Sequence, residues 1–275
     1  LCASRQWDLS HELLDAAEIT ARFPNFTPGP EDIAVYDAKP GFARPELTVR
    51  AHLEIAEKAG ATLQFGEPVL QWSQTAAGMR VVTGRGSYTA GQLVICPGAW
   101  APQVLGQFGV PITVERQVMY WLDPVGGASR FEDHPIYIHE NASGIPIYGL
   151  PAIDGPRGGV KVGFARNGIA CTPHTIDRVV HEREISEIRA RVAELLPALA
   201  GKCLHAATCM YSNTPDQHFV IGRHPQCADV VMACGFSGHG FKFVPLVGEI
   251  LADLAIDGAT DHRIALFDPQ RLPSA

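Results

Sequence analysis

The sequence predicts a mixed α/β fold in which an α/β domain is interrupted by a second domain built mainly from antiparallel strands. Strands and helices alternate towards both ends of the chain, whereas residues 112–165 are typical of consecutive strands. The 275 residues are 46% hydrophobic and 19% charged, which is the composition of a globular protein with a substantial core.

The first part of the chain contains two predicted helices and a group of short strands. Apolar residues at Leu13, Leu14 and Ile19 indicate a helix within residues 8–23, ahead of a proline-rich loop. A second helix begins at Pro45 and ends before Gly60, because proline suits the first turn of a helix and glycine suits its end. Strands are then predicted at residues 62–65, 69–73, 79–83 and 92–96, with a hairpin turn at 84–86 and a short helix after residue 98.

The rest of the chain continues with strands and two longer helices. Strands are predicted at residues 112–122, 135–139, 145–150 and 160–164. An amphipathic helix is predicted over residues 182–199, because Ile185, Ile188 and Val192 lie on one face. Further strands are predicted at residues 204–211, 218–221 and 230–233, and a strongly apolar helix at 240–256.

The composition argues against several classes of protein. The formal net charge of −7 and the pI near 5.9 are unlike those of a nucleic-acid-binding protein, which usually presents a basic surface. A helix that crosses a bilayer needs about 18 consecutive apolar residues. No apolar run in this sequence is that long, so no membrane span is expected. The seven cysteines form no CxxC pair and no ligand-spaced cluster with histidine. We therefore expect no metal site, and reduced thiols favour a cytoplasmic location.

The most informative segment is residues 235–243, with the sequence GFSGHGFKF. It follows an apolar strand and opens the last predicted helix. Its glycines allow the backbone to approach a flat ligand, and the start of a helix offers free N–H groups and positive potential. A glycine-rich turn without a ligand has the same pattern, so the residues alone leave both interpretations open.

This segment and the preceding CMYSNTPDQHF at 209–219 closely resemble the C-terminal region of the monomeric sarcosine oxidase and N-methyltryptophan oxidase family. The resemblance extends over nearly the whole chain and includes RGSYTA at 85–90, PGAW at 97–100, RQV at 116–118, YGLP at 148–151 and VKVGF at 160–164. It implies a Rossmann-like FAD-binding domain interleaved with a substrate domain on a mixed, mainly antiparallel sheet. The FAD-binding domain would comprise residues 47–112 and 212–275, and the substrate domain residues 1–46 and 113–211.

One feature of that family is missing from this sequence. The family begins with a strand, a GxGxxG turn and a helix that bind the FAD pyrophosphate, with an acidic residue about 20 positions later for the ribose. Here Gly84-Arg85-Gly86 lacks the third glycine, and residues 235–240 have a different spacing. The resemblance therefore implies an incomplete FAD-binding domain, an N-terminally truncated chain, and weak or absent FAD binding by this chain alone.

The resemblance implies an oxidase that uses FAD to oxidise a secondary amino acid such as sarcosine. The imine hydrolyses to amine and aldehyde, and O2 is reduced to hydrogen peroxide. Lys242 matches the family lysine that binds the substrate carboxylate, and a cation at a helix start is itself disfavoured without an anionic partner. Lys161 matches the lysine that promotes oxygen reduction beside the flavin. A solvated surface position is the alternative for either lysine.

Other matches concern the substrate cavity and the cofactor. Tyr148 and Tyr211 match aromatic residues that line the cavity, although either is equally consistent with the core. Cys209 matches the family's covalent flavin anchor, whereas an unpaired cysteine more often only packs in the interior. The resemblance also assigns FAD contacts to Val69, near the adenine, and to Gly98, Ala99, Trp100, Gly238, His239, Gly240 and Phe241. The scattered histidines such as His11, His52 and His134 show no ligand spacing.

The resemblance leaves alternatives in function. Ala165 stands where family members carry a histidine that contacts the substrate, so a larger or differently charged N-alkyl amino acid is as suitable as sarcosine. A glycine, D-amino acid or pipecolate oxidase, a dehydrogenase, and an inactive fragment remain alternatives. The expected partners are the amino acid substrate and O2, without nucleic acid or membrane, and the expected state is a monomer.

Overall fold

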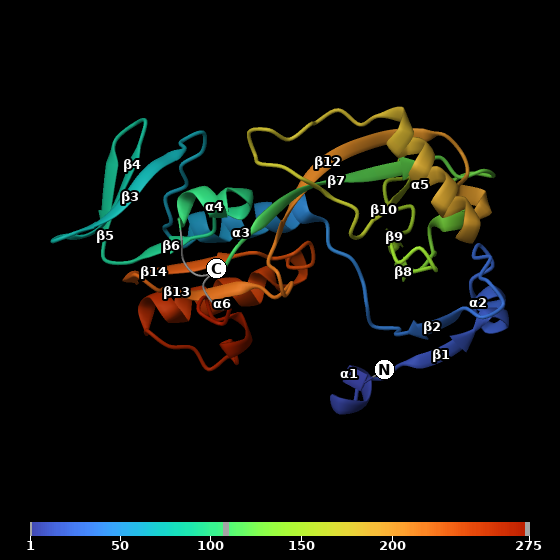
Figure 1. The fold of residues 1–275 in the computed structure, drawn as a ribbon, viewed down its shortest axis with the longest axis horizontal. Coiled ribbons are helices and arrows are strands. Elements are labelled where there is room, and N and C mark those ends of the chain that lie inside the picture. Colours follow the sequence, from blue (N-terminus) through green and yellow to red (C-terminus); the bar gives the residue numbers. More distant parts are fainter. Residues whose placement is uncertain (1, 107–109, 273–275) are drawn as a thin grey trace. The chain divides into compact units, whose positions relative to one another are not determined.

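The computed structural model describes residues 2–106 and 110–272, which form two compact units. Unit 1 comprises Leu1–Phe42, Gln117–Gly168 and Asp177–Cys209, and unit 2 comprises Ala43–Arg116, Ile169–Ile176 and Met210–Ala275. Each unit is therefore built from segments that are far apart in the sequence (Figure 1). Residues 1, 107–109 and 273–275, which the predicted domain boundaries include, lie outside the described residues.

The main sheet of unit 1 has the strand order β11–β7–β10–β9–β8, and β12 also pairs with β7. Strands β7, β10, β9 and β8 pair antiparallel in that order, while β11, the first residues of β7 and the last residues of β12 are assigned to unit 2. The strands are β7 (Thr113–Leu122), β8 (Tyr137–His139), β9 (Ile147–Gly149), β10 (Val160–Phe164), β11 (Ile169–Ala170) and β12 (Cys203–Asn213). A separate antiparallel pair consists of β1 (Glu12–Asp15) and β2 (Ile33–Tyr36). The helices of unit 1 are α1 (Cys2–Gln6), α2 (Ala16–Arg22) and α5 (Glu182–Leu195).

The core of unit 1 lies on one face of this sheet. Side chains alternate between the two faces of a strand, so Val160 and Val162 of β10 point the same way, and both are fully buried. They belong to one apolar cluster with Tyr120 and Leu122 of β7 and with the apolar side of α5, including Ile188 and Val192. The intervening residue Lys161 therefore lies on the opposite face, away from the core.

An aromatic cluster in unit 1 encloses His134, which is only 6% exposed. The His134 ring lies 4.6 Å from the ring of Phe26 and 5.1 Å from that of Phe131, measured between centroids. Its Nε2 has no hydrogen-bond partner among the described residues. Burial lowers the pKa of His134 from 6.5 to about 4, because the charged imidazolium is poorly solvated there.

We expect His134 to make the free energy of unfolding depend on pH. The pKa is lower in the folded state than in the unfolded chain, so protonation favours unfolding. The free energy of unfolding therefore has its full value above pH 6.5 and decreases by about 3 kcal/mol as the pH drops towards 4. Denaturant unfolding between pH 4 and 7.5 should show a weaker pH dependence for His134→Phe than for the wild type. The exposed His174→Gln serves as control, and equal slopes in all three proteins would contradict the assignment.

Unit 2 contains a three-stranded sheet of order β13–β14–β6 and a three-stranded meander of order β3–β4–β5. In the first sheet β14 pairs antiparallel with β13 and parallel with β6; in the second both pairs are antiparallel. The strands are β3 (Val69–Thr75), β4 (Gly78–Thr83), β5 (Ser87–Ala90), β6 (Leu93–Ile95), β13 (Val220–His224) and β14 (Cys227–Cys234). The helices are α3 (Pro45–Lys58), α4 (Ala101–Val104) and α6 (Val244–Ile256).

Strand β14 is buried on both faces, which explains its unbroken apolar sequence. Val231 and Ala233 pack in one cluster with the apolar side of α6, including Val247 and Leu251. The alternate residues Val230, Met232 and Cys234 pack in a second cluster with Ile95 of β6 and Ala101 of α4. Apolar side chains thus cover this sheet on both faces.

Most of the predicted elements are confirmed, and two are wrong. Residues 8–23 do not form one helix. The Asp15 carboxylate accepts the Glu18 N–H in a capping box, so that β1 ends at Asp15 and α2 begins with the next residue. Residues 62–65 are not a strand, and no described strand pairs with them, so their β-type sequence lacks the backbone partner that a strand needs. Strands β1, β2, β5 and β11 were not predicted, and the hairpin turn at 84–86 joins β4 to β5 and not to the strand at 92–96. Among the described residues, no helix is both long enough and apolar enough to cross a membrane.

Candidate functional site

Two loops leave the same edge of the β13–β14–β6 sheet. Strands β6 and β14 run parallel with Ile95 opposite Met232, so their carboxyl ends point the same way. The glycine loop (residues 235–240) follows β14, and the Pro97 turn (residues 97–100) follows β6. Ligands of open α/β sheets bind outside the carboxyl ends of parallel strands. The fold therefore brings two predicted cofactor-binding segments to the edge where a ligand is expected.

The glycine loop requires its glycines. Gly235 and Gly238 have φ values of +63° and +76°, which side chains other than glycine rarely adopt. A Cβ atom on Gly238 would collide with the ring of Tyr211, and one on Gly240 would collide with Phe236. The loop backbone therefore packs directly on its aromatic neighbours, and Gly238 and His239 remain exposed at the sheet edge.

Aromatic rings fix the orientation of His239. Its ring lies 4.9 Å from that of Phe219, and its Nδ1 donates to the Ser237 carbonyl at 3.0 Å. Because the carbonyl oxygen only accepts, the Nδ1 atom carries the proton. Phe219 itself is buried and also contacts Phe236, at 4.9 Å between ring centroids. The predicted contact residue His239 is thus held by ring packing on one side and by a backbone hydrogen bond on the other.

Lys242 lies in the short 3-10 turn Phe241–Phe243, directly before α6. Its Nζ lies 5.7 Å from the centroid of the Phe243 ring. Within residues 2–106 and 110–272 its ammonium has no hydrogen bond or ion pair, and its side chain is exposed. A cation at the N-terminal end of a helix is electrostatically unfavourable. The position therefore suits a cation that binds an anionic ligand.

Lys161 and Tyr148 lie on the face of the unit 1 sheet that is opposite the core. Lys161 is paired in register with Trp121 of β7, and its Nζ lies 5.4 Å from the centroid of that indole. Tyr148 is paired with Gly163, and its ring covers the space where a Cβ of Gly163 would be, with the hydroxyl 2.8 Å from that point. Residues 161 and 163 point the same way, so the half-buried ammonium and the phenol share one face.

Cys209 lies on β12, the strand next to β7, and its side chain is half-buried. Burial raises the pKa of the Cys209 thiol above its usual value, and the positive charge of Lys161 opposes this in part. The covalent link expected at Cys209 needs the thiolate, which nearby positive charge favours. That charge is present, but its effect is smaller than that of burial.

The remaining predicted cofactor residues occupy different surroundings in unit 2. Gly98 has a φ of +55° and open space where a Cβ would be, so its backbone is accessible at the sheet edge. Trp100 and Phe241 are largely exposed, whereas Ala99 is buried. Val69 begins β3 in the other sheet of unit 2 and is 51% exposed. Tyr148, Lys161 and Cys209 thus belong to unit 1, and Tyr211, Lys242 and the FAD-contact residues belong to unit 2.

Sequence reasoning missed two residues of this region, Trp121 and Thr214. Trp121 lies between Lys161 and His205, and its ring is 4.9 Å from the His205 ring. The signal for it was a large aromatic residue at the polar-face position of a predicted strand. Thr214 is buried beside Gly235 and hydrogen-bonds the glycine loop, which no local pattern indicates.

These features fit the ring end of a flavin better than its phosphates. At one sheet edge, Gly98 has open space beside its backbone, and Gly238 and His239 of the glycine loop are exposed, as contact with a flat ring requires. Among the described residues no GxGxxG turn is present for the pyrophosphate. The described residues also contain no cluster of three or more His, Cys, Asp or Glu side chains that could hold a metal ion.

Comparisons with known proteins agree with this geometry. Residues 2–254 match the DAO family model, described as FAD dependent oxidoreductase. The chain is 57% identical to a monomeric sarcosine oxidase of Streptomyces avermitilis, covering 100% of this chain and 72% of that protein. It is 32% identical to an N-methyl-L-tryptophan oxidase of Shigella dysenteriae, covering 96% of this chain and 70% of that protein. The solved L-proline dehydrogenase of P. horikoshii has the same fold, with a TM-score of 0.83, 23% identity, and coverage of 97% and 70%.

The likeness in sequence extends over the full chain and includes both the sheet-edge loops of unit 2 and the lysine face of unit 1. The chain belongs to the monomeric sarcosine oxidase and N-methyltryptophan oxidase family of FAD-dependent oxidoreductases.

Proposed function

We propose that this protein is an FAD-dependent oxidase of N-methyl amino acids. The substrate loses two electrons and two protons to become an imine, which water converts to an amine and an aldehyde. Oxygen takes up the two electrons and two protons and leaves as hydrogen peroxide. The observation that carries the proposal is Lys161, a half-buried cation whose ammonium has no carboxylate partner among the described residues and lies over the Trp121 ring. Such a cation stabilises negative charge that develops on oxygen.

The cofactor is assigned to the sheet edge of unit 2. Residues 47–112 and 212–275 would form the FAD-binding domain, with backbone contacts from Gly98, Ala99 and Trp100, and from residues 238–241. Residues 1–46 and 113–211 would form the substrate domain. FAD supplies the hydride acceptor when bound, and the chain's own residues bind and orient the amine. The exposed positions of Gly98 and Gly238 and the family membership support this assignment.

The proposed substrate follows from the charge and the size of the side chains that would contact it. Lys242 would bind the carboxylate, and its lack of an ion pair in the described residues supports that role. Tyr148 and Tyr211 would line the cavity. The curated relatives are named for sarcosine and N-methyl-L-tryptophan, both of which are N-methyl amino acids. Ala165, whose side chain is small, leaves more room than a histidine would, which favours an N-methyl amino acid larger than sarcosine.

Cys209 would hold the flavin covalently. The bond forms between its sulfur and a methyl carbon of the ring system, with loss of the thiol proton and one methyl hydrogen. The two electrons that are released pass to oxygen. The positive charge of Lys161 favours the thiolate that this reaction needs.

The experiment that tests the proposal compares amino acids as substrates in the presence of excess FAD. We expect hydrogen peroxide from sarcosine and from larger N-methyl amino acids, with kcat/KM at least about tenfold above that for glycine, D-alanine or pipecolate. Peroxide is measured with a coupled peroxidase, and oxygen uptake is measured in parallel. Preference for glycine, a D-amino acid or pipecolate would favour those oxidase activities instead. Substrate-dependent dye reduction without peroxide would indicate a dehydrogenase.

A further inference from the structure

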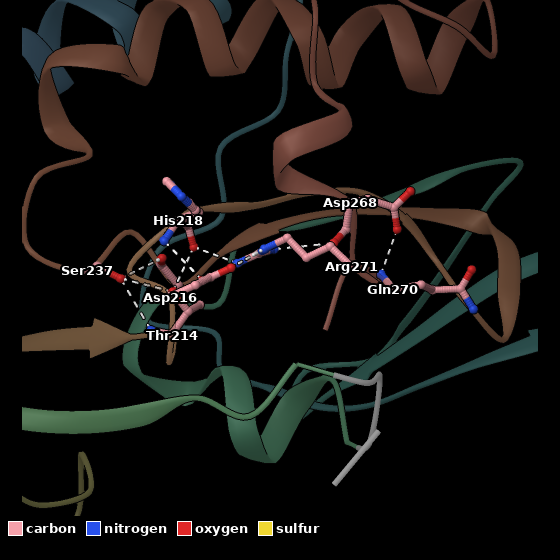
Figure 2. Close-up of polar contacts among 8 residues, drawn as sticks. Thr214, Asp216, His218, Ser237, Asp268, Gln270 and Arg271 are labelled. Carbon is pink, nitrogen blue, oxygen red and sulfur yellow. Dashed lines mark hydrogen bonds and ion pairs between the residues drawn. The ribbon is translucent and has the colours of Figure 1, made fainter. Parts of the chain in front are cut away.

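We call residues 265–272 the C-terminal clasp. This segment begins with the short turn Ala265–Phe267, and Arg271 near its end fixes it to the rest of unit 2. The Arg271 guanidinium donates from Nε to Asp216 Oδ2 at 2.7 Å and from Nη2 to Asp216 Oδ1 at 2.9 Å. Nη2 also donates to the His218 carbonyl at 2.9 Å (Figure 2). The two side chains are only 10% and 25% exposed. This bidentate, largely buried pair is of the strong kind.

Aromatic packing provides a second attachment for the clasp. Phe267 stacks on Phe219, with ring centroids 5.3 Å apart and an interplanar angle of 21°. The same Phe219 ring contacts Phe236 and His239 of the glycine loop, at 4.9 Å each. One buried ring therefore touches the clasp and the glycine loop together.

The polar attachment also leads to the glycine loop. Asp216 and His218 belong to the turn between β12 and β13, and the Thr214 hydroxyl donates to the His218 carbonyl at 2.8 Å. The Thr214 N–H donates to Ser237 Oγ in the glycine loop at 3.3 Å, as Figure 2 shows. The Thr214 methyl group also fills the space beside Gly235. The His218 carbonyl thus accepts hydrogen bonds from both Arg271 and Thr214.

Ser237 needs this support. Its φ is +47°, in the left-handed region that residues other than glycine adopt only when their surroundings impose it. Its N–H donates to the Ser212 carbonyl at 2.9 Å, and its hydroxyl bonds the Gly235 carbonyl at 3.2 Å. The first contact runs to the end of β12, just before the turn that Arg271 holds, and the second stays within the loop.

We infer that Arg271 and Phe267 are positioning residues that hold the glycine loop in the shape needed to bind the flavin. They act through Asp216, Thr214 and Phe219. The inference rests on the proposed function, because that function assigns the flavin contacts to residues 238–241. A loop that is in the binding shape for only a fraction of the time lowers the apparent affinity by that fraction. Loss of the clasp should therefore weaken FAD binding without removing any residue assigned to contact FAD.

The test combines hydrogen–deuterium exchange of the full chain with titration by FAD. In Arg271→Ala we expect the amides of residues 236–240 to exchange at least about tenfold faster, and FAD to bind about tenfold more weakly. Arg271→Lys keeps the charge but loses the fork geometry, so it should give intermediate values for both. Arg22→Ala is the matched control, because Arg22 forms an exposed 2.9 Å ion pair with Glu12 in unit 1. It should change neither quantity.

Two further variants keep the test decisive if Arg271→Ala does not fold. Asp216→Asn and Phe267→Leu weaken one attachment each and should accelerate the same amides. Unchanged exchange of the loop in folded variants, or equal acceleration over the whole chain, would overturn the clasp. Faster loop exchange with unchanged FAD affinity would overturn its role in flavin binding. A wild-type chain that binds no FAD would contradict the proposed function for this chain, an outcome that the missing GxGxxG turn allows. The exchange data would still decide whether the clasp orders the loop.

Discussion

Lys161→Met should slow the reoxidation of the reduced flavin by oxygen by about 100-fold or more, while reduction by substrate changes by only a few-fold. The reason is electrostatic. The first electron that reaches oxygen creates negative charge, and the half-buried ammonium over Trp121 is the cation on this face that has no carboxylate to neutralise it among the described residues. Methionine has a similar length and no charge, so it removes the charge with little change in packing.

Stopped-flow measurement of the two half-reactions separates these effects. Reduction is followed anaerobically with substrate, and reoxidation is followed after mixing reduced enzyme with oxygenated buffer. Lys202→Met serves as control, because Lys202 is an exposed lysine of the same unit just before β12. It should leave both rates unchanged. Equal slowing of the two half-reactions in Lys161→Met would show that Lys161 does not act on oxygen.

Cys209→Ser should convert a covalently bound flavin into one that acid or heat releases. Serine has nearly the same size, but its hydroxyl is not deprotonated at neutral pH, so the bond to the flavin cannot form. The holoenzyme is denatured in acid, and the flavin that stays on the protein is measured by mass and by fluorescence on a gel. Complete release from the wild type, or equal retention by Cys209→Ser, would contradict the assignment.

Cys203→Ser is the matched control for this experiment. Cys203 lies on the same strand, is also half-buried, and has a pKa raised by burial. It should retain the flavin as the wild type does. The two sites differ in the cation that opposes the effect of burial on the thiol pKa, which is Lys161 at Cys209 and Arg189 at Cys203. Lys161→Met should therefore also slow the attachment of flavin to Cys209, since it leaves the thiol with a higher pKa.

Local sequence was sufficient wherever short-range interactions decide the structure. Helix α3 begins at Pro45, as the position of that proline predicts. Helix α5 ends at Leu195 and not at residue 199 as predicted, because Pro197 has no N–H to continue the helix, and residues 197–199 form a 3-10 turn. The β10 strand and the apolar β14 strand were equally clear. Residues 62–65 show the limit, because their β-type sequence forms no strand without a neighbouring strand in the described residues.

The site was predicted as a set of residues, but their grouping was not. Sequence placed Lys161 on a strand without deciding which face it occupies, and the burial of Val160 and Val162 decides this. It likewise could not indicate that burial outweighs positive charge at Cys209, because both effects come from other strands. Trp121 was missed for the same reason, since its contact with Lys161 depends on the register between β7 and β10.

The sequence by itself determined most of the elements, the glycine-rich turn and the family, because these depend on neighbouring residues and on ordered motifs. Tertiary structure alone decided that Arg271 meets Asp216, 55 residues away, and that Phe219 joins the clasp to the glycine loop. Such contacts depend on how sheets and loops close over long stretches of chain. A local sequence pattern does not indicate which distant segments come together. Packing and hydrogen-bond geometry in the folded protein select the partner of each buried group.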